Sequence, residues 1–157
     1  ADVTDFSFQL YSARKFPPLD ATFNMIAATG YAQVEGYGAL FPDDADLGAL
    51  RSDLDAAGVT MPTVHIGVDM IRDRPARAIE IARAVGAEAV FGPHLSPAER
   101  PATADSWAAF GAGFAEAAKP LQDAGLLVGW HNHDFEFQPI EGELPIDLML
   151  SASETAL

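Results

Sequence analysis

The chain has 157 residues, 49% of them hydrophobic, which is enough for one domain with a hydrophobic core. Its formal net charge is −14 with only 9 Lys plus Arg, and no apolar run approaches the roughly 18 residues of a membrane span, so we expect neither nucleic-acid nor membrane partners. Cysteine is absent, which excludes disulfides and thiolate chemistry and fits the cytoplasmic location that we expect.

Short apolar runs that look like strands recur along the chain. The first, "FSFQLYS", alternates apolar and polar residues, and the last, "LLVGW", is continuously apolar and leads into "HNH". The predicted strands fall within residues 6–12, 31–38, 59–67, 87–94 and 126–133.

Helical periodicity fills the segments between these runs. Asp20 is expected to cap the first helix, and the second is expected over residues 46–57. Pro75 suits the first turn of the third, and Thr103 or Asp105 can start the fourth, whose last turn Pro120 is expected to kink or shorten. A glycine suited to a left-handed cap follows each helix: Gly30, Gly58, Gly86 and Gly125.

This alternation predicts an α/β fold with parallel strands joined by right-handed crossovers. A short apolar segment, "IDLML", follows the last strand. Two architectures fit a single domain over residues 1–157. One is an open, doubly wound, flavodoxin-like sheet, and the other is the first five β/α units of a (β/α)8 TIM barrel.

The polar residues at the strand ends favour the barrel. All four histidines and Glu35 lie at the carboxyl ends of predicted strands, where both folds place their active-site and ligand-binding residues. The histidines are His65, His94, His131 and His133. A doubly wound nucleotide-binding sheet would more typically carry a glycine-rich phosphate loop after its first strand, and "QLYSARKF" offers none.

The run "HNHDFEF", residues 131–137, is the densest group of proton-exchanging side chains. His131 and His133 share one face if the strand continues, because side chains alternate. Glu136 has the opposite parity, so the chain must turn or bulge near Asp134 for it to join them. Imidazole and carboxylate are both ordinary ligands of divalent metals, and imidazole also moves protons near neutral pH.

Four segments together resemble the successive strand ends of the sugar phosphate isomerase/epimerase group of the xylose isomerase-like TIM-barrel superfamily. They are "FSFQLYSAR", "GYAQVEGYG", "PTVHIGVD" and "VGWHNHDFEF", and the resemblance runs in order from about Phe6 to Leu150. It implies metal-assisted proton transfer next to the carbonyl of a sugar or sugar phosphate. It also implies a divalent metal ion (Mn, Zn, Mg or Co) at the barrel mouth.

The resemblance suggests a role for each strand-end residue. Glu136 is expected as a metal ligand, and His131 and His133 as catalytic acid/base groups or ligands. Glu35 is expected in the catalytic site, where it would orient substrate hydroxyls together with His65. Tyr11 and Trp130 are candidates for substrate binding by stacking on the sugar, with packing in the core as the alternative.

The family pattern continues beyond Leu157, where a sixth strand should begin and where three further metal ligands are expected. We therefore expect an N-terminal fragment that lacks the full site, binds metal weakly and shows no substantial isomerase activity. Its outer strands would lack partners, which predicts self-association.

Two other functions stay open at this point. A dehydratase or lyase acting on inososes or keto-sugars would use a similar metal and base. A non-enzymatic interaction fragment needs neither. The endonuclease branch of the same superfamily requires basic DNA-facing loops, which this acidic chain lacks.

Overall fold

A computed structural model describes residues 5–153 of the chain. The contacts divide it into two compact units. Within the described range, unit 1 comprises residues 5–65 and 79–90, and unit 2 comprises residues 66–78 and 91–153. No helix in the described range is long and apolar enough to cross a membrane.

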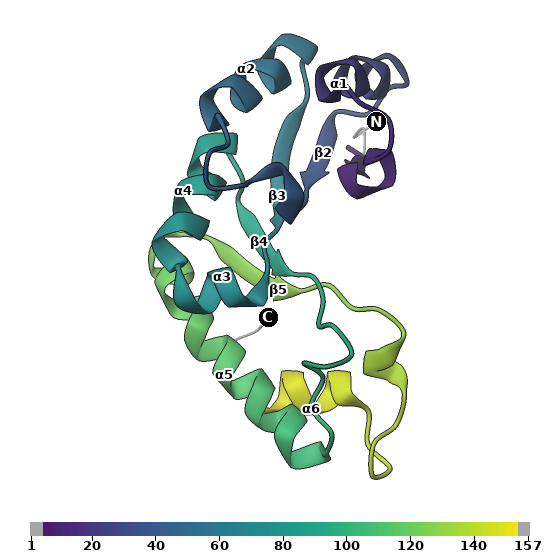
Figure 1. The fold of residues 1–157 in the computed structure, drawn as a ribbon, viewed down its shortest axis with the longest axis vertical. Helices are drawn as coiled ribbons and strands as arrows, with labels where there is room; N and C mark the ends of the chain where they lie inside the picture. Colours follow the sequence, from purple (N-terminus) through teal and green to yellow (C-terminus); the bar gives the residue numbers. More distant parts are fainter. Residues whose placement is uncertain (1–4, 154–157) are drawn as a thin grey trace. The chain divides into compact units, whose positions relative to one another are not determined.

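Unit 1 contains the first three strands and most of the helices that follow them (Figure 1). In chain order its elements are β1 (Ser7–Gln9), the 3-10 helix η1 (Leu10–Ala13), α1 (Leu19–Ala28), β2 (Gln33–Gly36), η2 (Gly38–Leu40), α2 (Leu47–Ala57) and β3 (Thr60–His65). It also holds most of α4 (Pro75–Val85) and the first half of β4 (Ala89–Gly92).

Unit 2 contains the second half of β4 and the elements that follow it, together with α3 (Val68–Asp73). They are α5 (Ala104–Asp123), β5 (Leu127–Trp130), η3 (Phe135–Phe137) and α6 (Pro145–Ser151). In this unit α5 and α6 pack side by side (Figure 1). The predicted apolar segment "IDLML" therefore lies in a helix.

The five strands form one sheet in the order β1-β2-β3-β4-β5, with β1, β2 and β3 in parallel register. Sequential order is what the first five units of a barrel require. A flavodoxin-like sheet would have the order 2-1-3-4-5. The barrel-type prediction is therefore confirmed, and the doubly wound alternative is excluded.

Local capping explains where several helices begin. The Asp46 carboxylate accepts a hydrogen bond from the backbone N–H of Ala49, which satisfies a free donor at the start of α2. Thr103 caps α5 through a reciprocal capping box with Ser106. Pro75 is the first residue of α4, as predicted. The starts at Thr103 and Pro75 were predicted because each depends only on neighbouring residues, whereas the capping role of Asp46 was not predicted.

Other local predictions were wrong or incomplete. Asp20 does not cap α1, because the cap residue is Pro18 and Asp20 lies within the first turn. Pro120 lies inside α5, which continues to Asp123, so the last turn is not shortened there, and the predicted kink stays a prediction. The first strand is shorter than predicted, because the chain turns into η1 at Leu10.

The four predicted cap glycines all adopt positive φ angles. Helix α3 was not predicted, because its 6 residues are too few for helical periodicity to be visible.

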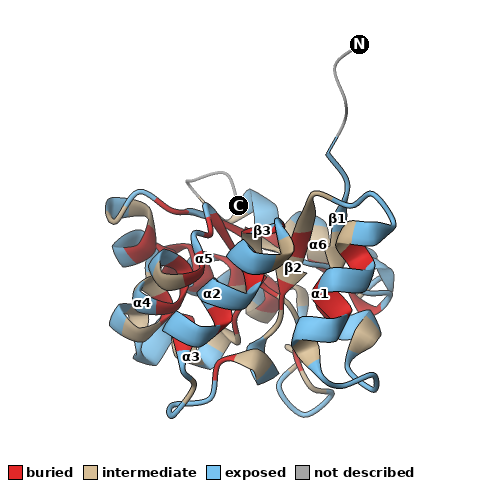
Figure 2. Cartoon of the chain, turned by 90° about the horizontal axis from the view of Figure 1, so that it is seen from above, coloured by how far each residue is buried: buried red, intermediate tan, exposed pale blue. Residues whose placement is uncertain are grey.

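Each unit has its own apolar core. In unit 1, α1 and α2 turn buried residues to one side and exposed residues to the other (Figure 2). Phe23 and Val34 are fully buried there, and Leu54 and Met61 nearly so. In unit 2 the core cluster consists of Leu95, Trp107, Phe135 and Met149. The two cores fix the strands whose ends carry the predicted site residues.

Candidate functional site

A hydrogen-bonded group of four side chains occupies the carboxyl ends of β1, β2 and β3 in unit 1. Glu35 is at its centre. Its Oε1 accepts a hydrogen bond from Nε2 of Gln9 at 2.5 Å, and its Oε2 accepts one from Oγ1 of Thr63 at 2.6 Å. Nε2 of His65 lies 3.0 Å from the same Oε1. We call Gln9, Glu35, Thr63 and His65 the strand-end network.

Strand register explains why these four residues meet. Gln9 is the partner of Glu35 across β1 and β2, and Glu35 is the partner of Thr63 across β2 and β3. His65 follows Thr63 by two positions and therefore returns to the same face of the sheet. An irregularity in the β2–β3 register between Gln33 and Glu35 brings Thr63 opposite Glu35. The network is thus a direct product of strand pairing.

The strand-end network stabilises the ionised form of Glu35. Burial by itself would raise the pKa of this carboxyl. Hydrogen bonds from His65, Thr63 and Gln9, together with the charge of His65, outweigh the burial, so the pKa of Glu35 lies below its usual range. A carboxylate with a low pKa that already accepts several hydrogen bonds is a poor general base. It is well suited to orient the imidazole of His65.

Tyr11 lies beside the strand-end network. The Oε1 atom of Gln9 accepts a hydrogen bond from the backbone N–H of Tyr11 at 3.0 Å, which fixes the start of η1. The Tyr11 ring makes an edge-to-face contact with Tyr37, with centroids 5.4 Å apart. Tyr11 is 53% exposed, so its ring is accessible to a ligand. The structure therefore brings together three of the predicted site residues: Tyr11, Glu35 and His65.

The other four predicted residues lie in unit 2, around the turn that follows β5. The chain turns at Asp134 into η3, as the parity of Glu136 required. Glu136 is 0% exposed. Its Oε1 accepts a hydrogen bond from the Trp130 indole N–H at 2.9 Å, and its Oε2 accepts one from the backbone N–H of His133 at 2.8 Å. Glu136 thus ties the histidine loop to the last residue of β5.

The imidazole rings form a second group in unit 2. The His133 ring makes edge-to-face contacts with His94 and His131, with centroids 4.8 and 5.1 Å apart. It also stacks on Phe135, which is buried and carries the guanidinium of Arg100 on its ring at 3.8 Å. All three histidines are exposed. They are accessible for proton exchange with a ligand.

These residues do not fit a bound metal ion. Glu136 is fully buried, and both of its carboxylate oxygens already accept hydrogen bonds, so it could not reach a metal without losing them. Across residues 5–153, no three His, Asp or Glu side chains are grouped closely enough to hold an ion. The metal-ligand role of Glu136 stays a prediction, and the burial and hydrogen bonding of its carboxylate disfavour that role.

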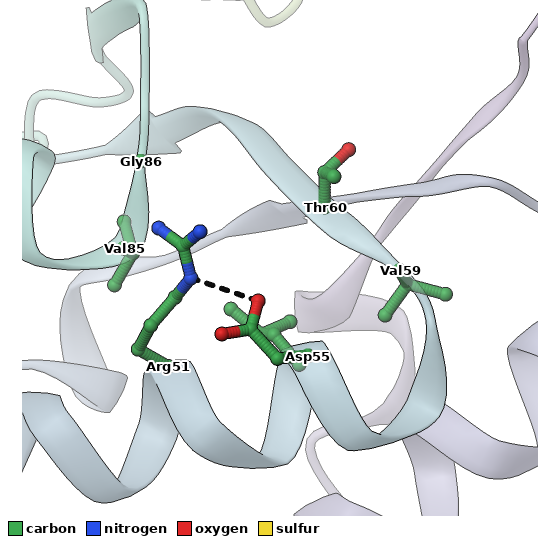
Figure 3. Close-up of a pocket in the computed structure, with 7 residues that line it drawn as sticks. Arg51, Asp55, Val59, Thr60, Val85 and Gly86 are labelled. Atoms are coloured by element: carbon green, nitrogen blue, oxygen red, sulfur yellow. Dashed lines mark hydrogen bonds and ion pairs between the residues drawn. The ribbon is translucent and has the colours of Figure 1, made fainter.

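A small pocket lies away from both groups, at the amino ends of β3 and β4 in unit 1 (Figure 3). Its volume is about 70 Å³, and its lining includes Thr60, Val85 and Gly86. The Arg51 side chain forms an ion pair with Asp55 at 2.9 Å and extends over Gly86. Because parallel-sheet enzymes place their chemistry at the opposite strand ends, we assign this pocket to packing.

Sequence reasoning missed Gln9, Thr63 and Tyr37 as members of the site. Gln9 and Thr63 look like ordinary strand residues until the register pairs each of them with Glu35. The only available signal was their placement near the ends of predicted strands. Tyr37 follows β2 directly, and its ring contact with Tyr11 depends on where η1 turns.

Comparison with known proteins supports the fold. No family model and no curated protein matches the chain. Among solved structures, a sugar phosphate isomerase/epimerase from Parabacteroides distasonis superposes with a TM-score of 0.82 at 19% identity. The match covers 98% of this chain and 64% of that one, so the chain spans less than two thirds of its neighbour. The resemblance that the sequence suggested is thus confirmed for the fold.

Two further structural neighbours are not described as isomerases or epimerases. An AP endonuclease of family 2 from Brucella melitensis matches with a TM-score of 0.64 at 19% identity, over 82% of this chain and 55% of that one. The IolI protein, solved with a bound zinc atom, matches with a TM-score of 0.62 at 12% identity, over 81% of this chain and 51% of that one. The fold is therefore shared by proteins with different activities, and function must be argued from the site.

Proposed function

We propose that this chain carries part of the active site of a sugar or sugar phosphate isomerase/epimerase. The reaction would be proton transfer at the carbon next to a carbonyl. The observation that carries the proposal is the strand-end network, in which Gln9, Glu35, Thr63 and His65 meet at the carboxyl ends of three parallel strands. The likeness to a solved sugar phosphate isomerase/epimerase supports the same class.

The strand-end network suits the recognition of a polyhydroxylated substrate. Amide, carboxylate, hydroxyl and imidazole groups lie together at these strand ends, so neighbouring sugar hydroxyls would find both hydrogen-bond donors and acceptors. Glu35 acts there as a positioning residue for His65. The exposed ring of Tyr11 would pack against the apolar face of the sugar. Trp130, whose indole N–H is held by Glu136, is assigned to packing in unit 2.

Proton transfer is assigned to exposed imidazoles. His131 and His133 are both exposed, and an imidazole can take and return a proton at neutral pH. Glu136 holds the backbone of His133 and thereby fixes this loop. Within residues 5–153 no group of three His, Asp or Glu side chains forms a metal site, so the proposed proton transfer uses imidazoles alone.

A dehydratase or lyase is the second candidate, because it begins with the same proton abstraction and then expels water. An endonuclease function is disfavoured despite the fold neighbour, since a chain with a net charge of −14 repels the phosphate backbone of DNA. A purely interacting fragment would leave the strand-end network without a ligand.

Titration of the chain with a keto-sugar, followed by amide NMR, tests the proposal. Ribulose and ribulose 5-phosphate should shift the resonances of Gln9, Glu35 and His65. His65→Asn and Glu35→Gln should weaken this binding, whereas Glu143→Gln, at an exposed position in unit 2, should not. Shifts that spare the strand-end network at tens of millimolar sugar would contradict the proposal.

The same samples in D₂O distinguish the reaction classes. Slow loss of the C–H signal next to the carbonyl, without a change in mass other than deuterium uptake, indicates an isomerase or epimerase. Loss of water from the sugar indicates a dehydratase. Binding without either change supports a non-catalytic role for the chain.

A further inference from the structure

The loop after β1 holds an arginine in a fixed position beside the strand-end network. The Arg14 guanidinium carbon lies 4.0 Å from the centroid of the Tyr11 ring. Its Nη1 donates a hydrogen bond to the Tyr11 carbonyl at 2.8 Å. Both interactions fix the same side chain to the same residue, so the positive charge is held in place before any ligand arrives.

This position is connected to Glu35 through a continuous chain of contacts. The Gln9 side chain donates to Glu35 with its Nε2 and accepts from the backbone N–H of Tyr11 with its Oε1. Tyr11 in turn carries Arg14 on its ring. The guanidinium is therefore held by Tyr11, whose backbone is hydrogen-bonded to the Gln9 side chain of the strand-end network, and all of these residues lie in unit 1.

Arg14 differs from the ion-paired basic residues in how its charge is used, and it shares with Arg100 a contact to an aromatic ring and a backbone carbonyl; of these two arginines, Arg14 is the one beside the strand-end network in unit 1. Arg51 pairs with Asp55, Arg72 with Asp73 and Lys119 with Glu116. For Arg14 the contacts within residues 5–153 are an aromatic ring and a carbonyl oxygen, and neither carries a compensating charge. A guanidinium has five N–H donors in a planar fork that matches an oxyanion, and one contact to a carbonyl leaves most of them for a ligand.

Because of the negative net charge of the chain, binding of an anionic substrate would depend on a local cation such as Arg14. A chain with a net charge of −14 repels anions unless a local cation offsets the field. Arg14 and Lys15 follow one another and are 2 of only 9 Lys plus Arg residues. They lie on the loop that leaves β1 at the edge of the strand-end network.

We infer that Arg14, held on the Tyr11 ring, binds the oxyanion of an acidic sugar whose hydroxyls occupy the strand-end network. The oxyanion is a phosphate or a carboxylate, and the residue selects charged sugars over neutral ones. This inference rests on the proposed function, since it places the neutral part of the same ligand at Gln9, Glu35 and His65.

The test compares four probes on the 157-residue chain: inorganic phosphate, ribulose, ribulose 5-phosphate and glucuronate. Affinities are measured by NMR titration, with the Arg14 Nε–Hε resonance as the local reporter. The variants are Arg14→Met, which keeps an apolar side chain on Tyr11, and Arg14→Lys, which keeps the charge without the planar fork. Arg51→Met is the matched control, because it removes an arginine from the opposite strand ends of unit 1.

The wild-type chain should bind ribulose 5-phosphate or glucuronate roughly tenfold more tightly than ribulose, the factor expected from one charge-assisted hydrogen bond. Arg14→Met should abolish this preference and leave ribulose binding unchanged. Arg14→Lys should retain part of it, and Arg51→Met should retain all of it. Which acidic sugar binds more tightly distinguishes a phosphate from a carboxylate ligand.

Failure of the inference and failure of the proposed function give different results. If Arg14→Met keeps the preference for charged sugars, Arg14 is not the selecting residue, although the sugar site stands. If inorganic phosphate shifts the Arg14 resonance while no sugar shifts the strand-end network, the anion site stands and the proposed function fails. If neither phosphate nor any acidic sugar shifts the Arg14 resonance, the inference is overturned.

Discussion

Replacing Glu136 by glutamine separates a structural role of this residue from a metal-binding one. The carboxylate is fully buried and accepts one hydrogen bond on each oxygen, from the Trp130 indole and from the His133 backbone. Glutamine preserves the shape but replaces one oxygen by an NH₂ group. Whichever way the amide is turned, that group meets an N–H donor, so one of the two hydrogen bonds is lost and the remaining one is no longer charge-assisted.

The size of the effect follows from these two contacts. A hydrogen bond to a charged group contributes about 1.5–3 kcal/mol, and a buried donor left without an acceptor costs about 1–3 kcal/mol. We therefore expect Glu136→Gln to lower the free energy of unfolding by about 3 kcal/mol, which for a chain of this size lowers Tm by roughly 6–12 °C. Glu143→Gln, at an exposed position, should change stability by less than about 0.5 kcal/mol.

Urea unfolding monitored by far-UV circular dichroism measures both variants, with and without EDTA. The structural role predicts that Glu136→Gln loses stability equally in both buffers and that EDTA leaves the wild type unchanged. A metal-ligand role predicts the opposite pattern, in which EDTA destabilises the wild type and leaves the variant unaffected. A glutamine variant as stable as the wild type would refute the two-hydrogen-bond argument.

Three further predictions follow from other parts of the structure. Gly111→Ala should destabilise the chain by roughly 1–3 kcal/mol in urea unfolding, because the new Cβ would lie 2.6 Å from the Met149 Cα where α6 packs on α5. Gly113→Ala, which has open space around it, should stabilise the chain by roughly 0.5–1 kcal/mol. Equal effects of the two substitutions would contradict the assigned packing. The pKa of Glu35 lies below its usual range in the folded state, so the ionised carboxylate stabilises the fold at pH values above the unfolded-state pKa, and this stabilisation is lost as pH falls through the folded-state pKa. The difference in unfolding free energy between wild type and Glu35→Gln should therefore shrink as pH falls from about 6 toward about 3. A difference that stays constant over this pH range would contradict the argument. Leu127 is 72% exposed on β5, the last strand of the sheet, so Leu127→Lys should reduce self-association in sedimentation velocity without lowering Tm, whereas a wild type that is monomeric at all concentrations would exclude edge pairing.

The sequence predicts the parts of the fold that depend on neighbouring residues. The Thr103 start of the fourth predicted helix, the cap glycines and the alternation of strands with helices are all local features, and the structure confirms them. Sequential strand order follows from the choice of a barrel, which the strand-end histidines favoured. Local sequence patterns did not predict the 6-residue helix α3, because short helices show little periodicity. They also did not predict the start of α1, because its cap residue, Pro18, makes no side-chain capping hydrogen bond.

The candidate site could be predicted only as a set of strand ends. Glu35 and His65 were expected in the same region, but their direct contact depends on a register irregularity in β2 that no local pattern encodes. Gln9 and Thr63 were missed for the same reason. Glu136 was placed correctly at a turn after β5, yet its burial depends on how that turn packs against Trp130.

Glu35 in unit 1 and Glu136 in unit 2 have comparable roles, each within its own unit. A general base needs a lone pair directed at the proton that it removes. The carboxylate oxygens of Glu35 accept hydrogen bonds from Gln9 and Thr63 and lie against His65, and those of Glu136 accept from Trp130 and the His133 backbone. Each glutamate therefore fixes an imidazole-bearing segment, Glu35 by contact with the His65 ring and Glu136 through the backbone of His133. Because the carboxylates are engaged, the proposed function leaves proton transfer to the exposed imidazoles, and substitution of either glutamate should act by displacing a histidine.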